Sequence, residues 1–485
     1  MHTSTSTYSA NKRSWTHPLS IDDSPSTLVL AFGAPELRDA SDVFQALRQK
    51  YPRAVVIGCS TAGEIGEDSV RDHSLVVSVT QFEATRLELA TIEVNDPAES
   101  FAAGLLVARR LEQTDLRAVF LLSEGIHVNG SELVRGINSR LPSHVVTTGG
   151  LAGDGTDFGR TWIYDGSRVR ERVVVAVGLY GDALSVTHGS RGGWQTKGRE
   201  HTVTLSKGNV VFELDGRPAL SVYEEYLGAT KDELPASGLL FPLSMRIGTD
   251  DTKRLVRTLL AVDREKQSLT FAGDVPMHAR VSVMESDENR LIAGAREASR
   301  TATVIPPPSD ADSLAVAISC VGRRLLLKER ARDEVAAVKS NLPARSHVVG
   351  FYSYGEICPF AVGHSDLHNQ TMTLTVFSEP ERRLARTRTS SHPPASGPAS
   401  VRPSMATRAA AESGATSLLA AERELQRAAA QATISLAPAS MPPSQNLSFT
   451  SPAITGTSSR GSGAMVVAWA LFFGVVGFLT WLAFR

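Results

Sequence analysis

The chain has few cysteines and no marked excess of either charge. Its three cysteines, Cys59, Cys320 and Cys358, form an odd and sparse set that is not a disulfide framework and that suits a reducing compartment. Lysine and arginine together number 50 and aspartate and glutamate 51, so the formal net charge is −1. Because this balance gives no overall positive field, we expect no nucleic-acid partner.

Several cofactor and targeting patterns are also missing. The chain has no G-x-x-x-x-G-K-[ST] loop, and the glycines of "GGLAGDGTDFG" (149–159) precede two strand-like runs instead of the helix that a dinucleotide fingerprint opens. Asp154 and Asp157 are three residues apart, whereas an EF-hand calcium loop spaces its first ligands by two. We therefore expect no cofactor and no bound metal. The first twenty residues lack the apolar core of a signal peptide, which predicts a cytoplasmic location for the folded part.

A long apolar stretch without a charged residue lies near the C-terminal end, at residues 464–484 (AMVVAWALFFGVVGFLTWLAF). At about 1.5 Å per residue, a helix of this length would span roughly 30 Å, the thickness of the hydrocarbon core of a bilayer. Trp469 and Trp481 lie toward its ends, where aromatic anchors are common. The sequence thus predicts a single-pass tail anchor in the cell membrane, with membrane lipid as a partner and the rest of the chain in the cytoplasm.

Composition separates the ends of the remaining chain from its middle. Residues 1–25 are polar, and we expect them to be disordered. Residues 380–463 are rich in Ala, Ser, Thr, Pro and Arg and poor in aromatics, so they cannot bury enough apolar surface to fold alone. Within this linker, residues 417–436 favour a short helix, which would be either a solvated isolated helix or a short dimerising coil. The folded region is therefore expected over residues 26–379.

The folded region repeats one pattern three times. A strand-like apolar run is followed by a helical stretch that ends before a proline, a second apolar run, and a glycine loop with a carboxylate. The second runs and their loops read AVVIGCSTAGEI (54–65), VVTTGGLAGDG (145–155) and VVGFYSYGEI (348–357). Such βαβ-like units make parallel crossovers, and α/β sheets bind ligands at the carboxyl ends of their strands. We predict a mixed α/β (α+β) fold whose three loops meet around one small molecule.

These loops supply the candidate ligand-binding residues. The carboxylate of each loop could accept hydrogen bonds from a ligand's ammonium group, or it could cap backbone N–H groups of its own turn. Tyr352 and Tyr354 could form an apolar wall with polar tips. Arg323 could bind an anionic group of the ligand, or it could form a surface salt bridge. The predicted ligand-binding residues are Cys59, Ser60, Thr61, Glu64, Gly149, Gly150, Asp154, Arg323, Tyr352, Tyr354 and Glu356.

Cys59 and Ser60 also raise the question of a nucleophile. A nucleophile elbow requires G-x-S-x-G, and the segment from Gly58 to Ala62 lacks the second glycine. A cysteine nucleophile needs a neighbouring histidine, and the twelve histidines form no recognisable constellation. A Cys- or Ser-dependent hydrolase or transferase stays open as an alternative, although we predict no catalytic residue.

Several stretches resemble the FIST family of bacterial sensory proteins. VIGCSTAGEI (56–65) and SEGIHVNGSELVRGINSRLP (123–142) are similar to the FIST N-terminal domain. The FIST C-terminal domain is resembled by NVVFELDGRPALSVYEEYLG (209–228), GFYSYGEICPF (350–360) and HNQTMTLTVFSE (368–379). The resemblance implies two sensor lobes, one over residues 26–200 and one over residues 201–379.

The FIST resemblance also implies a function. It indicates an intracellular input module that binds a small ligand, such as an amino acid or a related metabolite, and passes a signal to an output. No kinase, cyclase or methyl-accepting segment follows the sensor, so we expect a signalling partner that acts in trans. A ligand-dependent shift between two arrangements of the lobes would carry the signal. A membrane-anchored protein-interaction scaffold is a further alternative.

Overall fold

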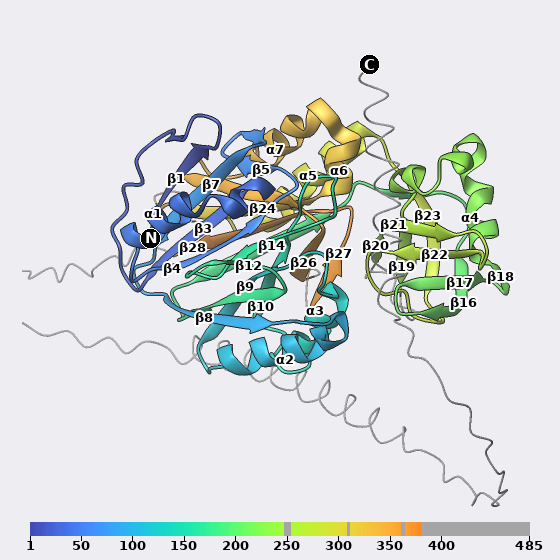
Figure 1. Cartoon of the computed structure of the whole chain (residues 1–485), viewed down its shortest axis with the longest axis horizontal. Coiled ribbons are helices and arrows are strands. Elements are labelled where there is room, and N and C mark those ends of the chain that lie inside the picture. Colours follow the sequence, from blue (N-terminus) through green and yellow to red (C-terminus); the bar gives the residue numbers. More distant parts are fainter. Residues whose placement is uncertain (247–253, 308–310, 360–363, 380–485) are drawn as a thin grey trace, which may run out of the picture. The chain divides into compact units, whose positions relative to one another are not determined.

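The computed structural model of the chain describes residues 1–246, 254–307, 311–359 and 364–379 (Figure 1). The predicted tail anchor at 464–484 and the linker at 380–463, with its expected helix at 417–436, lie outside these residues. Within the part that is described, no helix is both long enough and apolar enough to cross a membrane.

Three units of similar topology form most of the fold, which is mixed α/β as predicted. In each unit two neighbouring strands run parallel, with a helix in the connection between them. The parallel pairs are β3 (Thr27–Gly33) with β4 (Val55–Ser60), β9 (Leu116–Ser123) with β10 (Val146–Leu151), and β24 (Ser313–Cys320) with β25 (Ser346–Ser353). The three predicted parallel crossovers are therefore confirmed. An antiparallel strand follows on the other side of the first strand: β7 (Ser74–Gln81), β13 (Val173–Tyr180) and β28 (Met372–Ser378).

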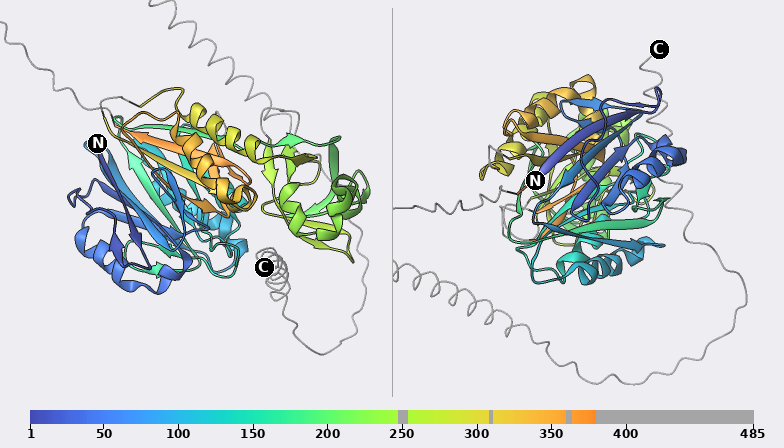
Figure 2. Two further views of the ribbon diagram at one scale, coloured as in Figure 1. Left: turned by 90° about the horizontal axis from the view of Figure 1, so that it is seen from above. Right: turned by 90° about the vertical axis from the view of Figure 1, so that its left-hand side faces the viewer.

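Helices pack on the outer faces of the three sheets. They are α1 (Ser41–Lys50) in the first unit, α2 (Ser100–Leu111) and α3 (Gly130–Asn138) in the second, and α5 (Glu288–Ala302), α6 (Val321–Leu327) and α7 (Ala331–Lys339) in the third. Figure 2 shows these helices as three groups, blue, cyan and yellow to orange, outside the strands. Side-chain caps begin two of them: Asn129 Oδ1 accepts from the backbone N–H of Ser131 and Glu132 at α3, and Asp287 accepts from that of Arg290 at α5.

Each unit contributes a short hairpin to the sheet of another unit. The hairpin after β4, formed by β5 (Glu64–Gly66) and β6 (Ser69–Arg71), pairs with β25. The hairpin after β25, formed by β26 (Gly355–Pro359) and β27 (Ser365–His368), pairs with β10. The hairpin after β10, formed by β11 (Ile163–Tyr164) and β12 (Val169–Arg170), pairs with β4. The exchange is cyclic, so each glycine loop leads from its own sheet into that of a neighbour.

The inner faces of the three sheets share one hydrophobic core. Phe32 of the first unit packs against Phe351 of the third, with ring centroids 4.9 Å apart, and Phe120 of the second packs against Phe377 at 6.3 Å. All four rings are buried. Because every unit supplies part of this core, no unit can bury its inner face alone, and the three fold as one body.

The N-terminal segment is ordered, so the prediction of disorder over residues 1–25 is wrong. β1 (His2–Ser9) pairs along its length with β7, and β2 (Ser14–Trp15) pairs with β1. Thr3, Ser6 and Tyr8 are buried. The polar composition of residues 2–9 gave no apolar pattern from which to predict a strand. The threonines nevertheless favour β structure, although they add little hydrophobicity. Strands β8 (Arg86–Glu93) and β14 (Ser185–Arg191) occupy the corresponding places beside β13 and β28.

A further sheet is inserted into the third unit between β14 and α5. Its strands are β15 (Gln195–Thr196), β16 (His201–Lys207), β17 (Val210–Leu214), β18 (Arg217–Pro218), β19 (Leu243–Arg246), β20 (Leu255–Arg257), β21 (Leu259–Asp263), β22 (Ser268–Phe271) and β23 (Arg280–Glu285). With α4 (Ala219–Leu227) the sheet encloses its own core, which includes Tyr223 and Phe271. The expected division at residue 200 falls where the chain enters this sheet. Strands from both sides of that division nevertheless pair, as β14 does with β28.

Candidate functional site

Two of the three glycine loops meet at a polar cleft of about 540 Å³. Thr61 to Glu64 come from the first loop and Asp154 to Asp157 from the second. The lining also includes Glu36, Arg38, Asp72, His73 and Arg160. The third loop does not line this cleft, although the Tyr354 hydroxyl donates a hydrogen bond to Asp154. The structure therefore brings the loops into contact in pairs, and it does not place all three around one cleft.

The loop carboxylates are already occupied by hydrogen bonds from the protein. Glu64 accepts from the Thr61 hydroxyl, from the Ser74 hydroxyl at 2.7 Å and from the Ser74 N–H at 3.2 Å. Glu356 repeats this pattern with the Ser353 hydroxyl at 2.7 Å and with the Thr371 hydroxyl and N–H at 2.9 and 3.2 Å. Since each side chain ties its loop to the start of the next long strand, the geometry favours the turn-capping alternative.

Asp154 has the same capping role in the second unit. Its carboxylate accepts from the backbone N–H groups of Gly159 at 2.8 Å and Arg160 at 2.6 Å, besides the Tyr354 hydroxyl. Only 5% of the side chain is exposed. The carboxylate thus closes its own loop and joins it to the third unit.

Burial also changes the charge of two of these groups. It raises the pKa of Glu64 to about 8, against the lowering effect of the hydroxyl donors Thr61 and Ser74. It raises the pKa of Glu356 to about 8 in the same way, against the effect of Ser353 and Thr371. Both side chains are therefore mainly protonated at neutral pH, and neither supplies a counter-charge for a ligand's ammonium group.

We expect these two carboxyl groups to make stability fall as the pH rises. The unfolded chain releases the protons near the ordinary glutamate pKa of 4.5, whereas the folded chain keeps them until about pH 8. Between these values the folded state binds more protons, so the free energy of unfolding declines with pH and levels off above about 8. Denaturant unfolding of Glu64→Gln and Glu356→Gln between pH 5 and 8 is expected to give a shallower decline than the wild type. An unchanged slope in both variants, matching that of the exposed control Glu329→Gln, would refute this assignment.

Arg323 lies in the protein interior rather than at a ligand site or on the surface. Its guanidinium pairs with Glu334, and both side chains are fully buried. It also donates to the carbonyl oxygens of Leu291 at 2.8 Å and of Gly192. The Tyr352 hydroxyl donates to the other Glu334 oxygen at 2.8 Å, so Tyr352 belongs to the same buried network. Both alternatives predicted for Arg323 are therefore wrong, because the donors of its guanidinium face groups of the protein itself.

Cys59 and Ser60 have no catalytic surroundings. Cys59 lies in the central core without exposed surface, and burial raises the pKa of its thiol well above the ordinary value. The Ser60 hydroxyl accepts from the Trp162 N–H at 2.9 Å. Neither has a basic side chain as a hydrogen-bond partner within the described part of the chain. Gly149 and Gly150 are equally internal, since their α-carbons lie against Leu121 and Ile318.

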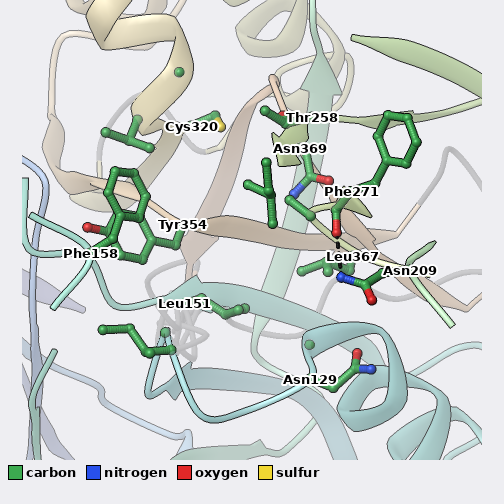
Figure 3. Close-up of a pocket in the computed structure, with 18 of the residues that line it drawn as sticks. Asn129, Leu151, Phe158, Asn209, Thr258, Phe271, Cys320, Tyr354, Leu367 and Asn369 are labelled. Atoms are coloured by element: carbon green, nitrogen blue, oxygen red, sulfur yellow. Dashed lines mark hydrogen bonds between the residues drawn. The ribbon is translucent and has the colours of Figure 1, made fainter. Parts of the chain in front are cut away.

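A second cavity, which the sequence did not reveal, lies between the inserted sheet and the second and third units (Figure 3). Its volume is about 160 Å³. Several segments of the units form one part of the wall, among them the loop after β9, the loop after β10, the start of α6, Tyr354 after β25, and the end of β27 with the loop before β28. The inserted sheet forms the rest. The lining includes Asn129, Leu151, Phe158, Asn209, Thr258, Phe271, Asp274, Cys320, Tyr354, Leu367 and Asn369.

The cavity wall is mainly apolar and partly preorganised. The rings of Phe158 and Tyr354 are stacked, with centroids 4.3 Å apart and planes inclined by 10°. Asn209 Nδ2 donates to the Phe271 carbonyl at 2.8 Å, which fixes the amide at the wall. Asn129 is fixed as the cap of α3. These contacts hold the wall residues in place without a ligand, as is common in small-molecule sites.

Two polar atoms in the cavity wall lack partners. The Thr258 hydroxyl and Asn369 Oδ1 are buried and form no hydrogen bond within the described chain. Their side chains are 5% and 1% exposed. In the view of Figure 3 they lie on one side of the cavity and the stacked Phe158 and Tyr354 rings on the other. Since the great majority of buried polar atoms are paired, this combination marks the cavity as the candidate site.

The sequence patterns indicated few of the residues that line this cavity. Of the residues predicted to bind a ligand, Tyr354 lines the cavity; Cys320, which was not among them, lines it too. Thr258 and Phe271 belong to the inserted sheet, which no repeat or motif announced. Asn369 lies in one of the stretches that resemble the FIST C-terminal domain, and this resemblance is the sequence feature that could have indicated it as a site residue.

The described part of the chain is thus a mixed α/β body of three units with an inserted sheet and a mainly apolar cavity beside it. The FIST N domain matches residues 27–217 and the FIST C domain matches residues 219–359. The chain therefore contains both FIST domains, as the sequence resemblance indicated. No curated protein matches the chain. Among solved structures, a cyanuric acid hydrolase from A. caulinodans is similar at 12% identity over 61% of this chain and 68% of that chain, with a TM-score of 0.18.

The border between the two FIST domains differs from the borders of the structural units. It falls at Pro218, at the end of β18 and immediately before α4, inside the inserted sheet. The cavity consequently receives Leu151 and Asn209 from the first domain and Thr258 and Phe271 from the second. The two domains build the candidate site together.

Proposed function

We propose that this protein is a small-ligand sensor whose ligand occupies the apolar cavity. Domains of the FIST family are generally proposed to sense small ligands. The observation that carries the proposal here is the pair of buried, unpartnered atoms, Thr258 Oγ1 and Asn369 Oδ1. A buried polar group without a partner costs about 1–3 kcal/mol, and a bound ligand would remove that cost. Proteins tolerate such local violations mainly at functional sites.

The cavity has room for a molecule of amino-acid size. A cavity needs about 10–15 Å³ to hold a single water, so 160 Å³ corresponds to roughly eleven to sixteen water-sized positions. Leu151, Phe271 and Leu367 offer apolar contact for the body of the ligand, and Thr258 and Asn369 offer hydrogen bonds. This division of labour is typical of sites for small organic ligands.

The position of the cavity supports a signalling mechanism. A ligand there would contact Thr258 of the inserted sheet and Asn369 of the third unit at the same time, and it would favour the arrangement in which both contacts form. The resulting shift is limited to the ligand's difference in affinity between the two arrangements. We propose that a partner protein acting in trans reads this change.

The proposal includes a membrane anchor at residues 464–484, which rests on the sequence alone. The full chain is expected to co-sediment with liposomes, and a chain that ends at Gly463 is expected to stay in the supernatant. Equal sedimentation of both chains would remove the anchor from the proposal without affecting the ligand site.

Replacing Thr258 or Asn369 should affect the stability of the ligand-free protein and its stabilisation by a ligand in different ways. Thr258→Val keeps the shape of the side chain and removes the hydroxyl, so we expect it to raise the free energy of unfolding of the ligand-free protein by about 1 kcal/mol. A thermal-shift screen with amino acids, amines, alcohols and related metabolites is expected to stabilise the wild type and to stabilise Thr258→Val and Asn369→Leu much less. Ser78→Ala is the control, because Ser78 Oγ is also buried and unpartnered but does not line the cavity. No stabilisation of the wild type by any compound at millimolar concentration would contradict the proposal.

A further inference from the structure

The charges around the cavity indicate what kind of ligand it accepts. None of the described residues that line it is a lysine, an arginine or a histidine, and Asp274 is the charged side chain among them. The Thr258 hydroxyl and Asn369 Oδ1 can both accept hydrogen bonds, as the Asp274 carboxylate can. The Thr258 hydroxyl and the Nδ2 group of Asn369 can also donate, so the feature that distinguishes this wall is the negative charge of Asp274, which matches a cationic head group.

The Asp274 carboxyl group interacts with two side chains of the segment that begins α3, Asn129 and Glu132. Its Oδ1 receives one long hydrogen bond, from Asn129 Nδ2 at 3.4 Å, and it forms no salt bridge within the described chain. Its backbone N–H donates to the Ser131 hydroxyl at 3.3 Å, which holds the residue at the N-terminal end of α3. Burial and the neighbouring Asp274 carboxylate raise the pKa of Glu132, against the lowering effect of Arg135. Two acidic side chains, Asp274 and Glu132, therefore lie close together at the N-terminal end of α3.

The nearest buried cation, Arg257, is engaged elsewhere. Its Nε donates to the Asp274 carbonyl at 3.0 Å, and its Nη1 donates to the carbonyls of Val256 at 3.2 Å and Leu367 at 2.9 Å. The guanidinium lies behind Gly273, where a Cβ atom would be 3.1 Å from Arg257 Nε. Burial lowers the pKa of Arg257 to about 10, so it stays charged at neutral pH. The cation thus orders the wall by binding backbone oxygens, and its side chain does not line the cavity.

We propose that the cavity selects a small apolar amine and discriminates against the corresponding amino acid or carboxylic acid. This inference rests on the proposed function and names the ligand class of the same site. An ammonium group buried there finds the Asp274 carboxylate as its counter-charge and Asn369 and Thr258 as acceptors. A carboxylate in the same space finds no cationic donor in the wall and is repelled by Asp274, and a buried charge without a partner is strongly unfavourable. The Phe158 and Tyr354 rings then contact the apolar body of the amine.

Glu64, Asp154 and Glu356 were expected to bind a ligand's ammonium group. The proposal assigns this role to Asp274 instead. Glu64 and Glu356 are mainly protonated at neutral pH, and all three side chains accept hydrogen bonds from other groups of the protein. Asp274 is a carboxylate that can accept hydrogen bonds from an ammonium group, and it lies in the wall of the apolar cavity.

Titration calorimetry on the full chain with matched probes tests the ligand class. Leucine is compared with 3-methylbutylamine, which lacks its carboxylate, and phenylalanine with 2-phenylethylamine; 3-methylbutanol and 4-methylpentanoate complete the set. We expect each amine to bind at least about tenfold more tightly than its amino acid, and the acid to bind most weakly. Asp274→Asn is expected to weaken amine binding by about tenfold or more and to leave the alcohol within about twofold. Asp157→Asn, which changes a carboxylate of the polar cleft, is the control and should leave amine binding unchanged.

The outcomes separate this inference from the proposed function. If leucine or phenylalanine binds as tightly as its amine, or if Asp274→Asn leaves amine affinity unchanged, the ligand class is wrong and the cavity remains a ligand site. If no probe binds, and the broader thermal-shift screen also shows no stabilisation, the proposed function fails together with the ligand class.

Discussion

Replacing Arg323 with methionine is expected to lower the free energy of unfolding by about 3–5 kcal/mol. The Glu334 carboxylate, which is fully buried, would then keep only the Tyr352 hydroxyl and the Ser319 hydroxyl as donors. A buried charge that loses its ion partner is strongly unfavourable because neither water nor another cation can reach it. The carbonyl oxygens of Leu291 and Gly192 would lose their donor as well.

Urea or guanidinium unfolding at neutral pH measures this loss. Arg330→Met is the matched control, since Arg330 pairs with Glu288 and Asp333 at the surface and is expected to leave the midpoint close to that of the wild type. The double variant Arg323→Met/Glu334→Leu should recover part of the stability, because no charge is then left unpaired. A midpoint for Arg323→Met that matches that of Arg330→Met would show that the ion pair is not buried as described.

Gly149→Ala is expected to destabilise the protein by a similar amount, about 3–5 kcal/mol. Gly149 pairs with Leu121 in the parallel register of β10 with β9, and a Cβ atom there would lie 1.8 Å from the Leu121 carbonyl oxygen. Its φ of +146° is also unfavourable for any residue with a side chain. The strands would have to separate, and both faces of this sheet are packed.

Gly155→Ala provides the comparison for this second substitution. Gly155 has a φ of +75° but nothing within 4 Å of a Cβ atom, so the change isolates backbone strain, about 1–2 kcal/mol. Thermal or denaturant unfolding should therefore place Gly149→Ala well below Gly155→Ala. Equal losses would mean that the close approach of the two strands does not contribute.

The local parts of the fold could be predicted because their signal is local. Each βαβ-like unit shows two apolar runs and a helical stretch within about forty residues, and the parallel pairs of β3 with β4, β9 with β10 and β24 with β25 follow. The carboxylate that follows each glycine was also recognised, together with its alternative as a cap. Capping is a contact between near neighbours, so the loop sequence contains most of what determines it.

The remaining features depend on contacts between distant segments. The hairpins that enter neighbouring sheets contain strands as short as Ile163–Tyr164, and no periodicity can be read from two residues. The threonine-rich β1 is a strand because β7 is available beside it. The inserted sheet and the segments from α5 to β27 together separate β14 from β28 by about 180 residues, so no local sequence pattern indicates that these strands pair.

The candidate site was missed for the same reason. Leu151, Thr258 and Asn369 come from three segments that are each about a hundred residues apart, and none of them belongs to a motif. The charge state of a side chain is equally invisible in the sequence. Glu64 and Glu356 were expected to be carboxylates, and Arg323 to be accessible, whereas burial makes the first two mainly neutral and encloses the third.

The repeated Thr/Ser–carboxyl contacts give the glycine loops a structural role. Thr61 with Glu64, and Ser353 with Glu356, fix the point at which the chain leaves its own sheet for the next one. This exchange links the three units in a cycle. The loop that contains Cys59 and Ser60 therefore has its role in the assembly of the fold. Ligand binding is assigned to the cavity beside Tyr354.

Native mass spectrometry of the full chain after incubation with a metabolite extract tests the central claim most directly. We expect the wild type to retain a small-molecule adduct and the double variant Thr258→Val/Asn369→Leu to lose it, while Ser78→Ala retains it. An adduct of equal abundance on the wild type and the double variant, or no adduct on the wild type, would contradict the assignment of the cavity as the ligand site.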